Sequence, residues 1–189
     1  MKTKLVTFTL GLILSTSIFS QQEIAGVKLP ATLKSADQSL VLNGGALREK
    51  WFLDLYVGAL YLTSKTSDGN KIAADDEPMV MRIELVSILV TSEKMANATY
   101  EGFEKSTNNN TAPLKADIDR FVNIFKKEPI VDKDIFEIIY TPNKGVSVTK
   151  NGKDQGVIIA GLVFKKALFG MWIGDNPVDD DLKEGLLGN

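Results

Sequence analysis

The chain has 189 residues, a length that suits one domain with a core large enough to need no disulfide or metal staples. It contains no Cys and no His, which excludes thiol nucleophiles, Ser–His dyads and imidazole metal sites. The 24 acidic and 22 basic residues give a formal charge of −2, which argues against a nucleic-acid partner and against electrostatic docking on anionic lipid.

The N-terminal segment, residues 1–20, has the three zones of a secretory signal peptide. Two lysines supply the positive start, an apolar run follows, and the small side chain of Ser20 suits a cleavage site. A membrane anchor requires roughly 20 consecutive apolar residues, and this run is shorter. We therefore expect cleavage before Gln21, which removes both lysines and changes the formal charge from −2 to −4. The expected location is periplasmic or secreted, without a stable membrane anchor.

The first half of the mature chain is predicted to form strands. Two short strands come first, at residues 23–28 and 39–43. The pair Gly44-Gly45 follows the second, and such a pair often marks a bulge or a close backbone approach. Residues 50–63 are apolar and rich in aromatics, which predicts a central strand buried on both faces. After a polar loop or short helix at residues 67–78, residues 79–87 alternate between apolar and polar, as in an antiparallel strand with one solvated face.

Helical spacing begins after residue 90. Thr91 can cap a helix that runs to about Lys105, and a second helix is predicted over residues 112–127. Strands return around the pair Asn151-Gly152, a strong hairpin signal, at residues 135–140, 146–150 and 155–158. Two helices close the chain, one over residues 162–173 and one after the run Asp179–Asp181. We interpret this run as helix capping and not as a cation site.

The order of these elements is strands, two helices, strands and two helices, and the strands are joined by hairpins or short turns. That order predicts an α+β fold, with one antiparallel β-sheet and a layer of α-helices packed on one face. Residues 21–189 are expected to form a single domain, since they contain no internal repeat and no linker.

Four motifs resemble the chalcone isomerase-like family, and they occur in the same order. They are residues 43–62, the helix start Ser92-Glu93-Lys94, the hairpin pair Asn151-Gly152, and residues 167–183. Together the resemblance covers roughly residues 23–189. It implies an antiparallel sheet with helices packed on it and a ligand cleft between them, in agreement with the predicted layers.

The resemblance also assigns residues to the polar set of the plant isomerase. Arg48 matches the Arg at the start of its long strand, and Tyr56 falls at a strand Thr. Three further polar positions are occupied here by Thr91, Ala98 and Met171. Asn97 lies one residue from the family's helix Asn, and because a helix turns about 100° per residue we expect it to point elsewhere. Most of the polar set is therefore missing, and we expect no chalcone chemistry, no catalytic residue, no metal and no cofactor.

The pattern is closer to the non-catalytic branch of the family, whose plastid members bind fatty acids through an Arg and a Tyr. By this resemblance, Arg48 and Tyr56 are expected to hold a carboxylate, and Met171 and Trp172 to line the cleft. Arg offers two charge-assisted hydrogen bonds and a Tyr hydroxyl adds a third. An apolar cleft then takes the tail at about 0.8 kcal/mol per CH₂. The leading expectation is an exported protein that binds a fatty acid or a similar apolar carboxylate.

Other interpretations are open from the sequence. Arg48 can instead pair with Glu49 or Asp54 at the surface, and Tyr56 can be a core residue. Eight residues separate Arg48 from Tyr56, roughly 26 Å along a straight strand, so both reach one carboxylate only if the chain bends. The alternative functions are an isomerase or intramolecular lyase that acts through Tyr56 or Lys50, and a structural or partner-binding protein with a filled cleft. A proton acceptor beside Tyr56 favours the former, and a filled cleft favours the latter.

Overall fold

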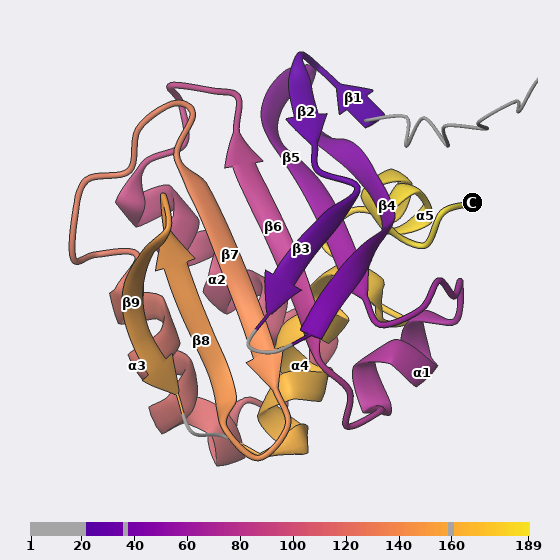
Figure 1. Ribbon diagram of the computed structural model, residues 1–189. Coiled ribbons are helices and arrows are strands. Elements are labelled where there is room, and N and C mark those ends of the chain that lie inside the picture. The colour runs from indigo at the N-terminus through magenta and orange to yellow at the C-terminus, as the bar shows by residue number, and fades with distance from the viewer. Residues whose placement is uncertain (1–21, 36–37, 159–160) are drawn as a thin grey trace, which may run out of the picture.

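The computed structural model describes residues 22–35, 38–158 and 161–189. The predicted signal segment and Gln21 lie outside the described residues. The chain forms a curled, fully antiparallel sheet with the helices gathered behind it in the view of Figure 1. This is the predicted α+β architecture.

Seven strands make up the main sheet, and they are hydrogen-bonded in chain order. They are β3 (Thr32–Ser35), β4 (Gln38–Lys50), β5 (Leu53–Leu62), β6 (Met79–Leu85), β7 (Ile135–Thr141), β8 (Gly145–Lys150) and β9 (Lys153–Ile158). A separate two-stranded sheet pairs β1 (Gln22–Ile24) with β2 (Val27–Leu29). Strands between β3 and β9 that follow one another in sequence are also neighbours in space, as in a meander.

The strand predictions for the N-terminal third were wrong in three respects. The predicted strand at residues 23–28 is a tight hairpin, because Ala25 and Gly26 both adopt positive φ (47° and 78°) and reverse the chain. Strand β3 was not predicted. The second predicted strand does not end at Asn43: β4 continues for 13 residues through the glycine pair. The pair is nevertheless a close approach, since a Cβ at Gly44 would lie 2.2 Å from the carbonyl oxygen of Gly185.

The helices agree more closely with the predictions, and the two expected side-chain caps are both present. They are α1 (Gly69–Ala74), α2 (Ser92–Ser106), α3 (Lys115–Ile124), α4 (Leu162–Ile173) and α5 (Asp180–Leu186), with a 3₁₀ turn at Ala112–Leu114 before α3. The Thr91 side chain caps α2 by accepting a hydrogen bond from the backbone N–H of Lys94. The Asp179 carboxylate caps α5 in the same way, at 2.8 Å from the backbone nitrogen of Leu182.

Two hydrophobic cores lie on opposite faces of the sheet. The larger one fills the space between the sheet and the helices and includes Phe103, Phe121 and Phe164. The smaller one lies under β2 and includes Leu29, Val57 and Tyr61. Alternate residues of β5 enter the two cores, which confirms the prediction that this strand is buried on both faces.

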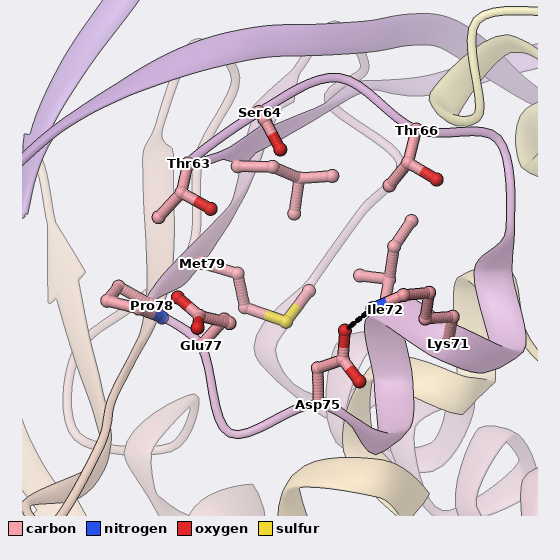
Figure 2. Close-up of a pocket in the computed structure, with 10 residues that line it drawn as sticks. Thr63, Ser64, Thr66, Lys71, Ile72, Asp75, Glu77, Pro78 and Met79 are labelled. Atoms are coloured by element: carbon pink, nitrogen blue, oxygen red, sulfur yellow. Dashed lines mark hydrogen bonds and ion pairs between the residues drawn. The ribbon is translucent and has the colours of Figure 1, made fainter.

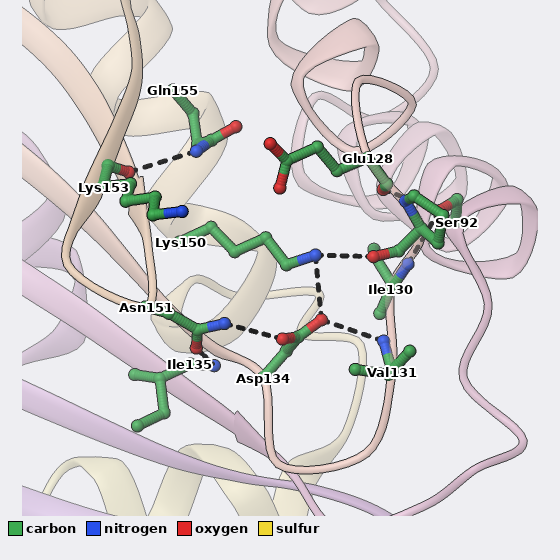
Figure 3. Close-up of polar contacts among 11 residues, drawn as sticks. Ser92, Glu128, Ile130, Val131, Asp134, Ile135, Lys150, Asn151, Lys153 and Gln155 are labelled. Carbon is green, nitrogen blue, oxygen red and sulfur yellow. Dashed lines mark hydrogen bonds and ion pairs between the residues drawn. The ribbon is translucent and has the colours of Figure 1, made fainter.

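A buried polar network fixes the loops at the end of the sheet where β7 begins (Figure 3). Lys150 lies 2.9 Å from Asp134 and donates to the carbonyl oxygen of Pro129 at 2.6 Å. Asn151 and the backbone N–H of Val131 also donate to the Asp134 carboxylate. Burial raises the pKa of Asp134, but these hydrogen bonds outweigh burial and hold the pKa below its usual value. The network holds the α3–β7 loop against the β8–β9 hairpin.

Within the described ranges, no helix combines the length and the apolarity needed to cross a bilayer.

Candidate functional site

A two-residue turn brings Arg48 and Tyr56 together. Trp51 and Phe52 both adopt positive φ (52° and 64°), and Lys50 pairs with Leu53 on the opposite strand. The predicted strand over residues 50–63 therefore begins at Leu53, with the turn before it. In the antiparallel register Arg48 lies directly opposite Tyr56, so their side chains share the face that the helices cover. Arg48 and Tyr56 are therefore not separated by the roughly 26 Å that a straight strand would place between them.

Arg48 is half-buried and has an unsatisfied donor. Its Nε is inaccessible to solvent and has no hydrogen-bond partner in the described structure. Its Cζ lies 5.5 Å from the centre of the Tyr56 ring, a cation–π geometry. Among the described residues it forms no ion pair, with Glu49 and Asp54 included. Because a buried unpaired donor is costly, this guanidinium is available to an anion.

Tyr56 is buried, with 4% of its surface exposed, but its hydroxyl belongs to a polar contact. Trp172 Nε1 donates a hydrogen bond to Tyr56 Oη at 3.0 Å. Burial raises the pKa of Tyr56, and the nearby Arg48 and Trp172 offset part of that effect, so the hydroxyl stays protonated at neutral pH. The indole N–H can only donate, so the Tyr56 proton is not used in this contact and can be donated to a ligand.

Met171 and Trp172, on α4, both lie in the core behind this contact. Trp172 reaches the site through the Tyr56 hydroxyl. Met171 packs against α2, where a Cβ at Gly102 would lie only 2.6 Å from its sulfur. The structure therefore brings Arg48, Tyr56 and Trp172 together. Met171 and Trp172 were both expected to line the cleft, but neither lines the apolar pocket that lies beside Arg48.

An apolar pocket of about 390 Å³ opens between the β4–β5 hairpin and the first half of α2. This volume lies within the range of small-molecule pockets, roughly 300–1,000 Å³. Arg48 and Tyr56 form part of its wall. The other lining residues are Lys50, Trp51, Leu53, Leu55, Leu89, Val90, Lys94, Met95, Asn97, Ala98 and Glu101. The cleft is therefore not filled by side chains.

The sequence predicted only part of the pocket wall that α2 forms. Ala98 had been assigned by resemblance, but the expectation that Asn97 points elsewhere was wrong, because Asn97 and Ala98 both line the pocket. The pocket is wide enough for its wall to include neighbouring helical positions. Leu55 and Tyr56 likewise both line it, although adjacent strand residues normally face opposite sides. The register shift after Arg48 leaves Leu55 as an extra residue, which explains this exception.

A second pocket, shown in Figure 2, lies between α1 and the start of β6 and has a volume of about 300 Å³. Its one lysine, Lys71, is already paired with Asp75 in the same wall. Pro78, Glu77 and three hydroxyl side chains also line it, so it is more polar than the first pocket. The described residues contain no group of three or more side chains arranged to bind a metal ion. The first pocket, in contrast, combines an apolar wall with Arg48, which forms no ion pair among the described residues.

The antiparallel sheet, its single helical layer and the pocket between them define an α+β protein with a site of small-molecule size. The family model described as chalcone isomerase-like matches residues 21–188, and the chain therefore belongs to the chalcone isomerase-like family. Among solved structures, the chain is similar to a fatty-acid binding protein from Arabidopsis thaliana, with a TM-score of 0.68. The two sequences are 18% identical, over 86% of this chain and 92% of that chain, and at this identity the likeness establishes the fold alone. No curated protein sequence matches the chain.

Proposed function

We propose that this protein is an exported member of the non-catalytic branch, and that it binds a fatty acid or a similar apolar carboxylate. The observation that carries the proposal is the Arg48 guanidinium, which lines an apolar pocket beside Tyr56 and forms no ion pair among the described residues. A carboxylate in the pocket would give this half-buried guanidinium a counter-ion. The structural neighbour from Arabidopsis thaliana is a fatty-acid binding protein, which supports an apolar ligand for this fold.

The polar end of the pocket suits a carboxylate head group. The Arg48 guanidinium can donate two hydrogen bonds to the two carboxylate oxygens. Tyr56 adds a third, because Trp172 already occupies the acceptor side of its hydroxyl and leaves the proton free. Glu101, which also lines the pocket, disfavours a dianionic ligand and makes a single carboxylate the better fit.

The apolar wall suits an alkyl tail. Leu53, Leu55 and Met95 are among the apolar residues that line the pocket. Burial of a tail of about ten methylenes contributes up to about 8 kcal/mol, before the free energy of ordering the ligand is subtracted.

Binding is favoured over isomerisation by the surroundings of Tyr56. In the described part of the chain, the polar groups against its hydroxyl are the Trp172 N–H and the Arg48 guanidinium, and neither can accept a proton. General acid–base catalysis needs an acceptor atom within about 2.6–3.2 Å of the atom that carries the moving proton. We expect no acceleration of chalcone ring closure above the buffer rate, and a saturable rate that disappears in Arg48→Ala would contradict this.

Titration calorimetry with decanoate and its methyl ester tests the binding proposal. Arg48→Ala should weaken decanoate binding about 10- to 100-fold, because a hydrogen bond to a charged group contributes about 1.5–3 kcal/mol. The ester, which has no charge, should bind both proteins almost equally. Arg120→Ala is the matched control, since Arg120 lies on the exposed side of α3 and pairs with Asp117. Equal losses for acid and ester would mean that Arg48 only supports the fold.

Export is a separate part of the proposal, and the charge and apolarity of residues 1–20 support it. The protein recovered outside the cytoplasm should begin at Gln21. N-terminal sequencing that finds Met1 in the exported protein would refute cleavage.

A further inference from the structure

Large apolar side chains are exposed mainly at one end of the sheet. Among the described residues, eight such side chains are exposed, and six of them lie in three neighbouring segments: the β4–β5 turn with the first residue of β5, the β6–α2 loop and the α3–β7 loop. These six, which we call the apolar rim, are Trp51, Phe52, Leu53, Ile88, Leu89 and Val131. The strand register puts the start of β5, the end of β6 and the start of β7 at the same end, the upper end in Figure 1.

The conformation of Trp51 and Phe52 in this turn is unfavourable in two respects. Both residues adopt positive φ, which favours Asn and Gly and strains residues with large side chains. Both are also exposed, Trp51 at 83% and Phe52 at 101% of their surface, so no packing within the chain compensates the strain. The hairpin at Asn151 and Gly152 has the same two-residue turn with the favoured residues. Such a local conflict is typical of a functional position.

The rim is continuous with the mouth of the pocket. Trp51, Leu53 and Leu89 belong to the rim and also line the pocket that contains Arg48. The neighbouring loop is held in place, because Lys94 donates to the carbonyl oxygen of Leu89 at 3.0 Å and Val86 donates to that of Leu55. A partner that covers the rim therefore also contacts the entrance of the pocket.

The shape of the rim favours a lipid surface over a protein partner. An aromatic side chain buries about 150–250 Å², so the tip of the hairpin and the adjoining loop offer roughly 500–600 Å². A stable protein interface takes roughly 800 Å² from each partner. A convex tip with an indole is suited to the bilayer interface, where Trp is enriched. Lys50, whose Nζ lies 5.5 Å from the Trp51 ring centre, can extend towards the head groups.

We propose that the apolar rim docks onto a lipid bilayer. Docking places the pocket entrance at the bilayer, into which an apolar carboxylate partitions. The exposed side chains of the rim support docking independently of the pocket. The role of the pocket at the bilayer surface rests on the proposed function. The charges on the flanks of the rim alternate in sign, as the neighbouring pairs Glu49-Lys50, Glu93-Lys94 and Asp132-Lys133. Docking is therefore driven by apolar insertion, and it requires neither anionic lipid nor low salt.

Tryptophan fluorescence with phosphatidylcholine vesicles tests the proposal directly. The chain has two tryptophans and none in residues 1–20, and Trp172 is already buried. A change in emission when vesicles are added therefore reports on Trp51, whether or not residues 1–20 are present. We expect a blue shift, quenching by lipids brominated on the acyl chain, and little change between 50 and 500 mM salt. Unchanged emission and no quenching would overturn the proposal.

The double variant Trp51→Asn/Phe52→Gly tests whether the turn carries the binding. It gives this hairpin the residues of the Asn151-Gly152 turn, so folding should be retained or improved. Partitioning onto vesicles in a flotation assay should fall at least about tenfold, because the apolar area at the tip is lost. The matched control is Leu162→Ser/Val163→Ser, which removes exposed apolar side chains at the start of α4 and should float like the wild type. Equal flotation of the Asn-Gly variant and the wild type would overturn the proposal.

Sedimentation without lipid and titration with decanoate separate the alternatives. A concentration-dependent dimer of the wild type that the Asn-Gly variant does not form would identify a second copy as the occupant and overturn docking on lipid. Wild-type protein that binds decanoate in solution and ignores vesicles refutes docking and leaves the proposed function intact. Protein that binds vesicles without binding decanoate refutes the proposed function and leaves docking intact.

Discussion

Replacing Tyr56 by Phe removes one oxygen atom that we expect to act twice, once in the fold and once in the pocket. In the fold, the change leaves the Trp172 Nε1–H without its acceptor at 3.0 Å. Trp172 is only 6% exposed, so water does not readily replace the lost partner. A buried unsatisfied donor costs about 1–3 kcal/mol, and we expect the free energy of unfolding to fall by that amount.

In the pocket, the same change removes the hydroxyl that we expect to donate to the ligand carboxylate. Because a hydrogen bond to a charged group contributes about 1.5–3 kcal/mol, decanoate should bind at least about tenfold more weakly. The methyl ester should lose much less affinity. Titration calorimetry measures both ligands, and urea denaturation measures the stability of the same samples.

Tyr61→Phe is the matched control for Tyr56→Phe. Tyr61 is also buried in β5, but it faces the smaller core and donates to the carbonyl oxygen of Pro30 at 3.0 Å. Its loss should lower stability by about 1 kcal/mol and leave the affinity for decanoate unchanged. If Tyr56→Phe lowers stability but not the affinity for the acid, the hydroxyl is structural and the assignment of Tyr56 to the site is refuted.

A double-mutant cycle with Trp172→Phe isolates the hydrogen bond from the loss of packing. If the contact is as the structure has it, the two changes together destabilise the fold by about 1 kcal/mol less than the sum of the single changes. Strict additivity would mean that the indole and the hydroxyl do not interact in solution.

Three further predictions concern the scaffold that carries the site. Asp134→Asn should lower the free energy of unfolding by about 3 kcal/mol at pH 7, because it leaves Lys150 buried without its counter-ion. The pKa of Asp134 is lowered in the fold, so this difference from wild type should shrink when thermal unfolding is measured at increasingly acidic pH. Burial lowers the pKa of Lys165 from 10.5 to about 8, with Asp75 and its acidic neighbours offsetting part of the effect, so the folded chain binds fewer protons than the unfolded chain between these values. Stability relative to Lys165→Met should therefore rise as the pH increases from 8 to 10.5, and a pH-independent difference in the urea midpoint would contradict the assignment. Gly44→Ala should lower stability by about 1–3 kcal/mol, because its Cβ would lie 2.2 Å from the Gly185 carbonyl oxygen, and an unchanged melting temperature would argue against this close approach.

The sequence by itself determined the elements whose signals are local. Thr91 and Asp179 begin helices because their side chains accept the first free backbone N–H groups, and both caps were recognisable from residue type and position. The Asn151-Gly152 hairpin was equally recognisable, since both residues tolerate the positive φ that the turn requires. The apolar run of residues 162–173 gave α4 with the predicted bounds.

Only the tertiary structure decided where the site lies. Trp51 and Phe52 are poor turn residues, so local propensity predicted one continuous strand and put Arg48 and Tyr56 far apart. The reversal of the chain there brings the two side chains onto one face, where α2 closes the pocket and Trp172 reaches Tyr56 across 116 residues of sequence. Such contacts depend on strand pairing and helix packing between distant segments. No window of the sequence contains that information, because the free energy that outweighs the local preference at the turn comes from the sheet and the core as a whole.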